Sequence, residues 1–114
     1  MIDVVIFGYG YLGTLLVKRI KDDHLKYNIV GFADNAEYKQ GYYVYGNKIM
    51  SIDELAEKSN VSVIVASEKN YEEIIEKCCE NRIKVEGVFL NNRIKKYPWA
   101  SFESKRQIEG ACPN

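Results

Sequence analysis

Long apolar runs and a basic leader are the first features that this sequence lacks. Its uninterrupted apolar runs are only a few residues long, as at 63–66, whereas a transmembrane helix needs about 20 apolar residues. Residues 1–4 show neither the basic segment nor the cleavage site of a secretory signal. We therefore expect a cytoplasmic location and no membrane partner.

Side chains that commonly perform catalysis or bind metals are scarce as well. His24 is the only histidine, and the three cysteines do not form a Cys-x-x-Cys pair. No tyrosine is followed four residues later by lysine, so a proton relay built from that pair is unsupported. We assign no catalytic residue and no metal ligand, and we do not expect this chain to be an enzyme on its own.

An excess of charge of one sign is also absent. Sixteen basic and sixteen acidic residues give a formal net charge of zero. Nucleic acids and anionic membranes attract proteins through a basic surface field, which this balance does not supply. We therefore expect no nucleic-acid partner.

What the sequence does contain is an alternation of short apolar runs with amphipathic segments. At 114 residues the chain is long enough for one domain. The periodicity predicts buried strands and helices in turn: strands at 2–7, 27–34, 61–66 and 84–90, and helices from Leu12 to about 22–23 and from Tyr71 to about Asn81. This order predicts an α/β fold whose mainly parallel sheet, of about four parallel strands, carries helices on both faces.

The region between the second and third predicted strands is less regular. We interpret 35–41 as a loop and the tyrosine-rich segment 42–50, with its Gly46-Asn47 pair, as a short extended piece or loose hairpin. Ser51 and Glu54 have the spacing of a capping box, which predicts a short helix to about residue 59. Asn70 and Glu73 resemble a second cap at the start of the next helix.

A glycine motif stands where the first strand meets the first helix. Gly8, Gly10 and Gly13 form a G-x-G-x-x-G pattern directly after the predicted strand. In this context the first glycine permits a tight turn, the second lets a pyrophosphate approach the backbone, and the third lets the helix pack closely on the strand. The helix N-terminus offers unpaired amides to the anion. The pattern therefore predicts a three-layer, Rossmann-like domain, although a tight turn without a ligand is the alternative.

Acidic and polar residues at other strand ends extend this predicted site. Asp34 ends the second strand and can accept hydrogen bonds from ribose hydroxyls, although a solvated acid or a cap would explain it too. It would repel a 2′-phosphate, and Asn35 rather than arginine follows, so the pattern favours NAD(H), or another nucleotide with a free ribose, over NADP. Ser67 could contact the ligand or cap a helix. We expect the cofactor-binding set to be Gly8, Tyr9, Gly10, Tyr11, Leu12, Gly13, Asp34, Asn35 and Ser67; Tyr9 and Tyr11 could equally serve in packing or at the surface.

The end of the chain differs from the rest. We divide the sequence into a nucleotide-binding domain at 1–90 and an aromatic, basic segment at 91–114, which carries five basic and two acidic residues. This segment is expected to pack back on the sheet edge. It could instead dock onto a partner domain or onto a second copy of the chain.

The segments 4–13 and 27–35 resemble the N-terminal Rossmann-like domain of nucleotide-sugar-processing proteins. That group includes sugar N-acetyltransferases of the left-handed β-helix type and nucleotide-sugar 4,6-dehydratases or epimerases. The similarity continues through 41–50, the capped helix at 51–55, the strand at 63–66 and the Tyr-Glu-Glu-Ile segment at 71–74. It implies a domain that binds a nucleotide, a nucleotide-sugar or NAD(H). In such proteins the catalytic residues lie in a part that follows this domain, and the resemblance does not extend to that part.

Three hypotheses follow from these observations. The first is a nucleotide-binding module for NAD(H) or a nucleotide-sugar, acting as a fragment, subunit or sensor in carbohydrate or surface-polysaccharide metabolism. The second is a subunit of an NAD-dependent oxidoreductase that needs a partner chain for catalysis. The third is a protein-interaction module with a vestigial nucleotide site.

Overall fold

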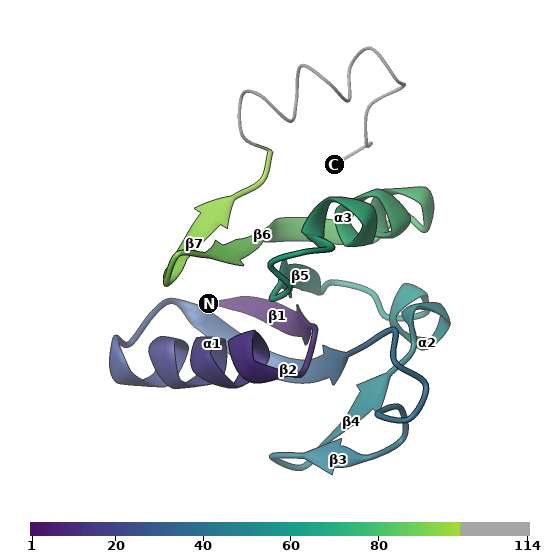
Figure 1. The fold of residues 1–114 in the computed structure, drawn as a ribbon, viewed down its shortest axis with the longest axis horizontal. Coiled ribbons are helices and arrows are strands. Elements are labelled where there is room, and N and C mark those ends of the chain that lie inside the picture. Colours follow the sequence, from purple (N-terminus) through teal and green to yellow (C-terminus); the bar gives the residue numbers. More distant parts are fainter. Residues whose placement is uncertain (99–114) are drawn as a thin grey trace.

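Over residues 1–98 the fold is built on one seven-stranded sheet with three helices (Figure 1). The computed structural model describes residues 1–98, so the part of the C-terminal segment from residue 99 onward lies outside the described residues. The elements in chain order are β1 (Ile2–Phe7), α1 (Tyr11–Asp22), β2 (Tyr27–Ala33), β3 (Tyr43–Val44), β4 (Asn47–Met50), α2 (Ile52–Ala56), β5 (Ser62–Val65), α3 (Tyr71–Glu80), β6 (Lys84–Leu90) and β7 (Arg93–Lys96).

Most of the sheet is parallel, as the alternation of strands and helices predicts. Its order is β3-β4-β2-β1-β5-β6-β7, and the five strands from β4 to β6 pair in parallel. Only β3 and β7, at the two edges, pair antiparallel with their neighbours. The expected α/β class is confirmed, with one parallel strand more than expected because β4 also joins β2.

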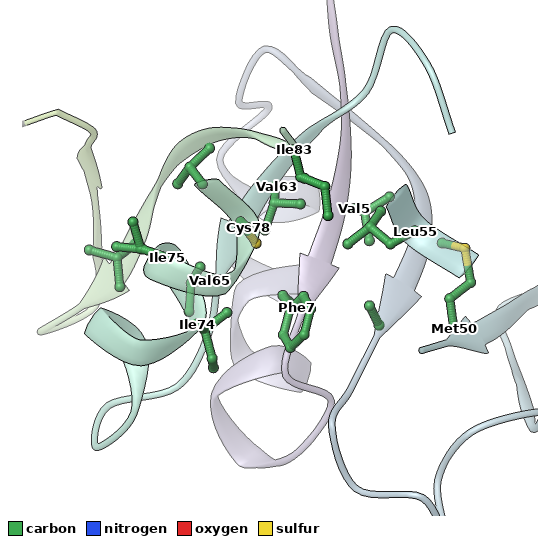
Figure 2. Close-up of a cluster of buried hydrophobic side chains, with 13 residues drawn as sticks. Val5, Phe7, Met50, Leu55, Val63, Val65, Ile74, Ile75, Cys78 and Ile83 are labelled. Carbon is green, nitrogen blue, oxygen red and sulfur yellow. The ribbon is translucent and has the colours of Figure 1, made fainter. Parts of the chain in front are cut away.

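Alternate side chains of β1 pack in two separate hydrophobic cores, one on each face of the sheet. Val4 and Ile6 pack in the core that α1 covers, which includes Leu16. Val5 and Phe7 pack in the core that α2 and α3 cover, where Ile74, Ile75 and Cys78 of α3 lie beside β5 (Figure 2). The period-two alternation of a strand thus produces three layers, with β1 buried at the centre.

The position of β1 also decides where a ligand could bind. The chain passes from β1 through α1 to β2 on one side, whereas β5 pairs with β1 on the other side. The connection that leaves the carboxyl end of β1 leads to β2, whereas the connection that leaves the carboxyl end of β5 leads to β6, so the two run in opposite directions from neighbouring strands. In open α/β sheets, such a reversal leaves a crevice at the carboxyl ends of the strands.

Local signals between β2 and α3 were correct in some places and wrong in others. The hairpin at 42–50 is confirmed: Tyr45 and Gly46 turn between β3 and β4 with φ of 50° and 78°, as a two-residue hairpin turn requires. The Ser51–Glu54 capping box is confirmed too, but α2 ends at Ala56 rather than near residue 59. The second predicted cap is correct in position, since Asn70 is the N-cap residue of α3, but its side chain makes no cap hydrogen bond, and its φ of −114° and ψ of 17° lie outside the extended conformation of a capping residue.

Part of the C-terminal segment joins the sheet. β7 pairs antiparallel with β6, and Gly87 lies opposite Lys96. A Cβ placed on Gly87 would lie 2.5 Å from the carbonyl oxygen of Lys95, so this glycine permits the close approach of β7. Residues 93–96 therefore pack on the sheet edge, which is the first of the arrangements expected for this segment. No helix within residues 1–98 is long and apolar enough to cross a membrane.

A partly buried polar contact joins two strands that are distant in sequence. The hydroxyl of Tyr27 donates to Glu86 Oε2 at 2.9 Å, and desolvation together with this carboxylate raises the pKa of Tyr27 to about 12. Because the folded-state pKa lies above the unfolded value near 10, this contribution to stability is present below pH 10 and is lost as the pH rises toward 12. We expect urea midpoints of the wild type to fall across that window more than those of Tyr27→Phe. Parallel pH curves for the two proteins would contradict this prediction.

Candidate functional site

A cleft of about 660 Å³ opens at the carboxyl ends of the central strands. Its lining comes from the β1–α1 turn, the end of β2 with the loop that follows, the end of β5, and one side of α3. The residues that line it from these four segments include Gly8, Gly10, Tyr11, Leu12, Asp34, Asn35, Lys39, Ser67, Asn70, Glu73 and Lys77. The cleft thus lies where the topology of the sheet predicts a crevice.

The turn from β1 into α1 is held tightly by backbone contacts. Gly8 has φ of +109°, a conformation that favours glycine, and its amide donates to the carbonyl of Ala33 at 2.8 Å. A Cβ on Gly8 would lie 2.6 Å from the carbonyl oxygen of Ala66. A Cβ on Gly13 would collide with the carbonyl oxygen of Gly8. The first and third glycines of the motif are therefore needed for packing.

Gly10 differs from the other two glycines because the space beside it is open. A Cβ at this position would have only the Nζ atom of Lys39 nearby, at 3.7 Å. Gly10 is also the N-cap of α1; no side chain caps this end, and the first turn contains no acidic residue. Unpaired amides and the positive end of the helix dipole therefore face this opening, an arrangement that suits an anion.

Asp34 links the end of β2 to the glycine turn. Its Oδ2 accepts the amide of Tyr9 at 2.8 Å, and its Oδ1 accepts the amide of Ala36 at 2.8 Å. The side chain is 13% exposed. Each carboxylate oxygen has a second lone pair, so Asp34 can hold the turn and still accept from a ligand hydroxyl.

Lys39 reaches into the cleft from the loop between β2 and β3. Its Nζ donates to the carbonyl of Tyr9 at 3.0 Å and lies 3.6 Å from Asp34 Oδ2. The loop is folded by hydrogen bonds of its own, including Lys39 N to Ala36 O at 3.0 Å. Sequence reasoning missed Lys39 because a lysine in an irregular loop has no periodicity that indicates its direction.

The structure brings seven of the nine predicted site residues into the cleft lining: Gly8, Gly10, Tyr11, Leu12, Asp34, Asn35 and Ser67. Gly13 is buried behind the turn. The ring of Tyr9 packs edge-on against Phe32, with centroids 5.1 Å apart, and only its backbone contacts Asp34 and Lys39. Tyr11 is 81% exposed at the rim of the cleft.

The wall formed by α3 was missed from the sequence. Asn70, Glu73 and Lys77 line this side, and their spacing of three and four residues places them on one helix face. From the sequence alone, the acidic residues of this helix resemble an ordinary solvated surface. Their position became evident only when α3 was placed across β5 and β6.

The described residues hold no candidate metal site, and the thiol of Cys78 is buried. Within residues 1–98, no cluster of histidine, cysteine, aspartate or glutamate could hold a metal ion. Cys78 is fully buried in the core below α3, and burial raises the pKa of its thiol to about 12. Such a thiol is a poor nucleophile near neutral pH.

Comparison with solved structures supports the fold. A UDP-D-quinovosamine 4-dehydrogenase from Vibrio fischeri matches with a TM-score of 0.66 and 18% identity, over 88% of this chain and 96% of that chain. RSP, a Rex-family repressor, matches in its complex with β-NADH with a TM-score of 0.60 and 17% identity, over 94% of this chain and 57% of that chain. This chain thus spans about half the length of the repressor chains that it matches. A search of curated proteins found no match.

One of these comparisons corrects an expectation from composition. RSP has also been solved with β-NAD⁺ and operator DNA, and that structure matches with a TM-score of 0.56 and 14% identity, over 82% of this chain and 46% of that chain. Our exclusion of a nucleic-acid partner was therefore wrong. A net charge of zero describes only the long-range electrostatic field of this chain. The repressor shows that a protein containing this fold can form a complex with operator DNA.

The sequence comparison places the chain in a family. Residues 1–89 match the family described as C2185-like, N-terminal. The match spans β1 through most of β6, including the glycine turn, Asp34 and the strands that surround the cleft. The chain belongs to the C2185-like N-terminal domain family.

Proposed function

We propose that this domain is a binding module for a nucleotide that carries a diphosphate, with NAD(H) or a nucleotide-sugar as its ligand. The observation that carries the proposal is the open space beside Gly10, at the uncapped start of α1 and at the carboxyl end of the central strand. These three features together suit a pyrophosphate.

The rest of the cleft fits the other parts of such a ligand. Asp34 is held by the amides of Tyr9 and Ala36 and retains lone pairs for ribose hydroxyls. A volume of about 660 Å³ lies within the usual range of about 300–1,000 Å³ for small-molecule sites. Ser67 and Asn70 add polar groups for a second ribose or a sugar. The repressor complex with β-NADH supports a dinucleotide, and the UDP-sugar dehydrogenase supports a nucleotide-sugar.

A role in carbohydrate or surface-polysaccharide metabolism is part of this proposal. It draws on the resemblance to nucleotide-sugar-processing domains and on the similar UDP-sugar dehydrogenase. We propose that the module positions or senses its ligand for another chain or domain, because in the nucleotide-sugar-processing proteins that it resembles the catalytic residues lie in a following part. Docking through residues 91–114, onto a partner or a second copy, remains a prediction.

Replacing Gly10 with alanine tests the proposal directly. The added methyl group would lie in the space assigned to the pyrophosphate, so we expect affinity for the natural ligand class to fall at least tenfold. The domain should keep its stability within about 0.5 kcal/mol, because the methyl group has only Lys39 Nζ nearby, at 3.7 Å. Titration calorimetry with NAD, NADH, NADP and UDP-N-acetylglucosamine would measure the first effect, and urea denaturation the second.

The outcomes of this experiment separate the competing hypotheses. Binding of NAD(H) without NADP, lost in Gly10→Ala, supports a dinucleotide site, and binding of the UDP-sugar supports sugar processing. Equal affinity in both proteins contradicts the assignment of the glycine turn. Absence of binding to the wild type contradicts the proposed function and favours an interaction module with a vestigial site.

A further inference from the structure

Acids outnumber bases in the lining of the cleft, which contains four carboxylates and two lysines. Asp34 places one carboxylate close to the opening above Gly10, and Glu73, Glu76 and Glu80 contribute the others from the α3 wall. A diphosphate brought to this cleft would be repelled by these carboxylates. A site that accepts it therefore needs a cation close to the turn.

Lys39 is the cation in that position. Its ammonium group lies 3.7 Å from the place where a Cβ of Gly10 would be, and 3.6 Å from Asp34 Oδ2. The side chain is 27% exposed, so the charge is partly shielded from water but remains open to the cleft. The other lysine of the lining, Lys77, belongs to α3 on the opposite wall.

The contacts of Lys39 leave it able to bind a ligand. An ammonium group has three donors, and the hydrogen bond to the carbonyl of Tyr9 uses one of them. The contact with Asp34 is an ion pair that is longer than a hydrogen bond. A phosphate oxygen above Gly10 could therefore take a remaining donor while the bond to Tyr9 holds the ammonium group in place.

We propose that Lys39 is the cation by which this cleft distinguishes ligands with a diphosphate from ligands without one. Its ammonium group offsets the charge of Asp34 and donates a hydrogen bond to the diphosphate of the bound nucleotide. The inference rests on the proposed function and adds a residue from outside the glycine motif. It assigns Lys39 to the diphosphate, because the hydrogen bond to the carbonyl of Tyr9 holds the ammonium group beside the glycine turn.

The test compares Lys39→Gln with the wild type in binding four probes: NADH, ADP, UDP and adenosine. We expect Lys39→Gln to weaken binding of the diphosphate probes by about tenfold to a hundredfold, the usual range for losing a hydrogen bond to a charged group. Binding of adenosine, which has no phosphate, should change less than twofold. Lys39→Arg should keep most of the affinity, since it retains the charge.

Two controls show that the effect belongs to this site. Lys48→Gln removes a lysine of equal charge that pairs with Glu54 on another surface, and it should leave every affinity unchanged. Circular dichroism and urea denaturation of Lys39→Gln should show an intact fold, because glutamine keeps two of the four methylene groups and ends in an amide that can still donate a hydrogen bond.

The results distinguish the role proposed for Lys39 from the function proposed for the domain. Equal losses for ADP and adenosine would overturn the inference and show that Lys39 acts only by ordering the loop. Loss confined to NADP, added as a fifth probe, would place Lys39 at a ribose 2′-phosphate and also overturn it. If the wild type binds NADH, ADP or UDP and Lys39→Gln binds them equally well, the inference fails while the proposed function stands. If the wild type binds none of them, the proposed function fails as well.

Discussion

Replacing Gly8 with alanine is expected to destabilise the domain by about 3 kcal/mol or more. Two independent effects add at this position. The backbone has φ of +109°, which an alanine adopts only with strain, and the new Cβ would lie 2.6 Å from the carbonyl oxygen of Ala66. Relieving the contact would move backbone rather than a flexible side chain, and overpacking of that kind commonly costs about 1–3 kcal/mol by itself.

The strain would fall at the centre of the fold. Gly8 follows the last residue of β1, and its amide bonds to Ala33 of β2 while its Cα faces Ala66 after β5. A shift there separates the three strands that surround the cleft. We therefore expect both the free energy of unfolding and ligand binding to be reduced, as measured by urea denaturation and by calorimetry.

Gly10→Ala is the matched control for this variant. It makes the same chemical change two residues further along the same turn. The new Cβ would have no backbone atom of another segment within 4 Å, and the φ of residue 10 is negative, so alanine would not be strained by a left-handed backbone. The pair should therefore separate stability from binding: Gly8→Ala should lose both, and Gly10→Ala binding alone. Equal stability of the two variants would show that the close contact with Ala66 relaxes without cost.

Replacing Asp34 with alanine is expected to lower stability by about 2–3 kcal/mol and ligand affinity at least tenfold. The variant removes the acceptor for the amides of Tyr9 and Ala36 and the counterion of Lys39. Hydrogen bonds to a charged group contribute about 1.5–3 kcal/mol each, and the expected total is lower than the sum because water can reach part of this site. The backbone bonds of residue 34, to Met50 and Gln40, remain in the variant.

Two further variants make the interpretation specific. Asp22→Ala removes an exposed carboxylate that pairs with Lys18 one helical turn away, and it should change stability by less than about 0.5 kcal/mol. Asp34→Asn keeps one acceptor oxygen without the charge, so it should fall between the wild type and Asp34→Ala. Wild-type stability of Asp34→Ala would contradict the structural role, and wild-type affinity would contradict the role in binding.

Local sequence determined much of the fold. β1 and β6 end at the residues that the apolar pattern predicts, and the Ser51–Glu54 pair caps α2 as expected. The glycine motif also predicted the turn after β1 and the start of α1, both of which line the cleft. These features depend on residues within a few positions of one another, so hydrophobic period and capping chemistry can specify them.

Other features of the site were decided by tertiary structure. Lys39 contacts Tyr9 across 30 residues, and the wall of the cleft on α3 depends on where that helix crosses the sheet. The addition of β7 depends on Gly87, whose missing side chain lets a second backbone approach. The sequence by itself therefore determined the four strands at 2–7, 27–34, 61–66 and 84–90, the helices between them and the glycine turn. The tertiary structure decided that Lys39 and one face of α3 line the cleft, because such contacts join segments that have no local signal for each other.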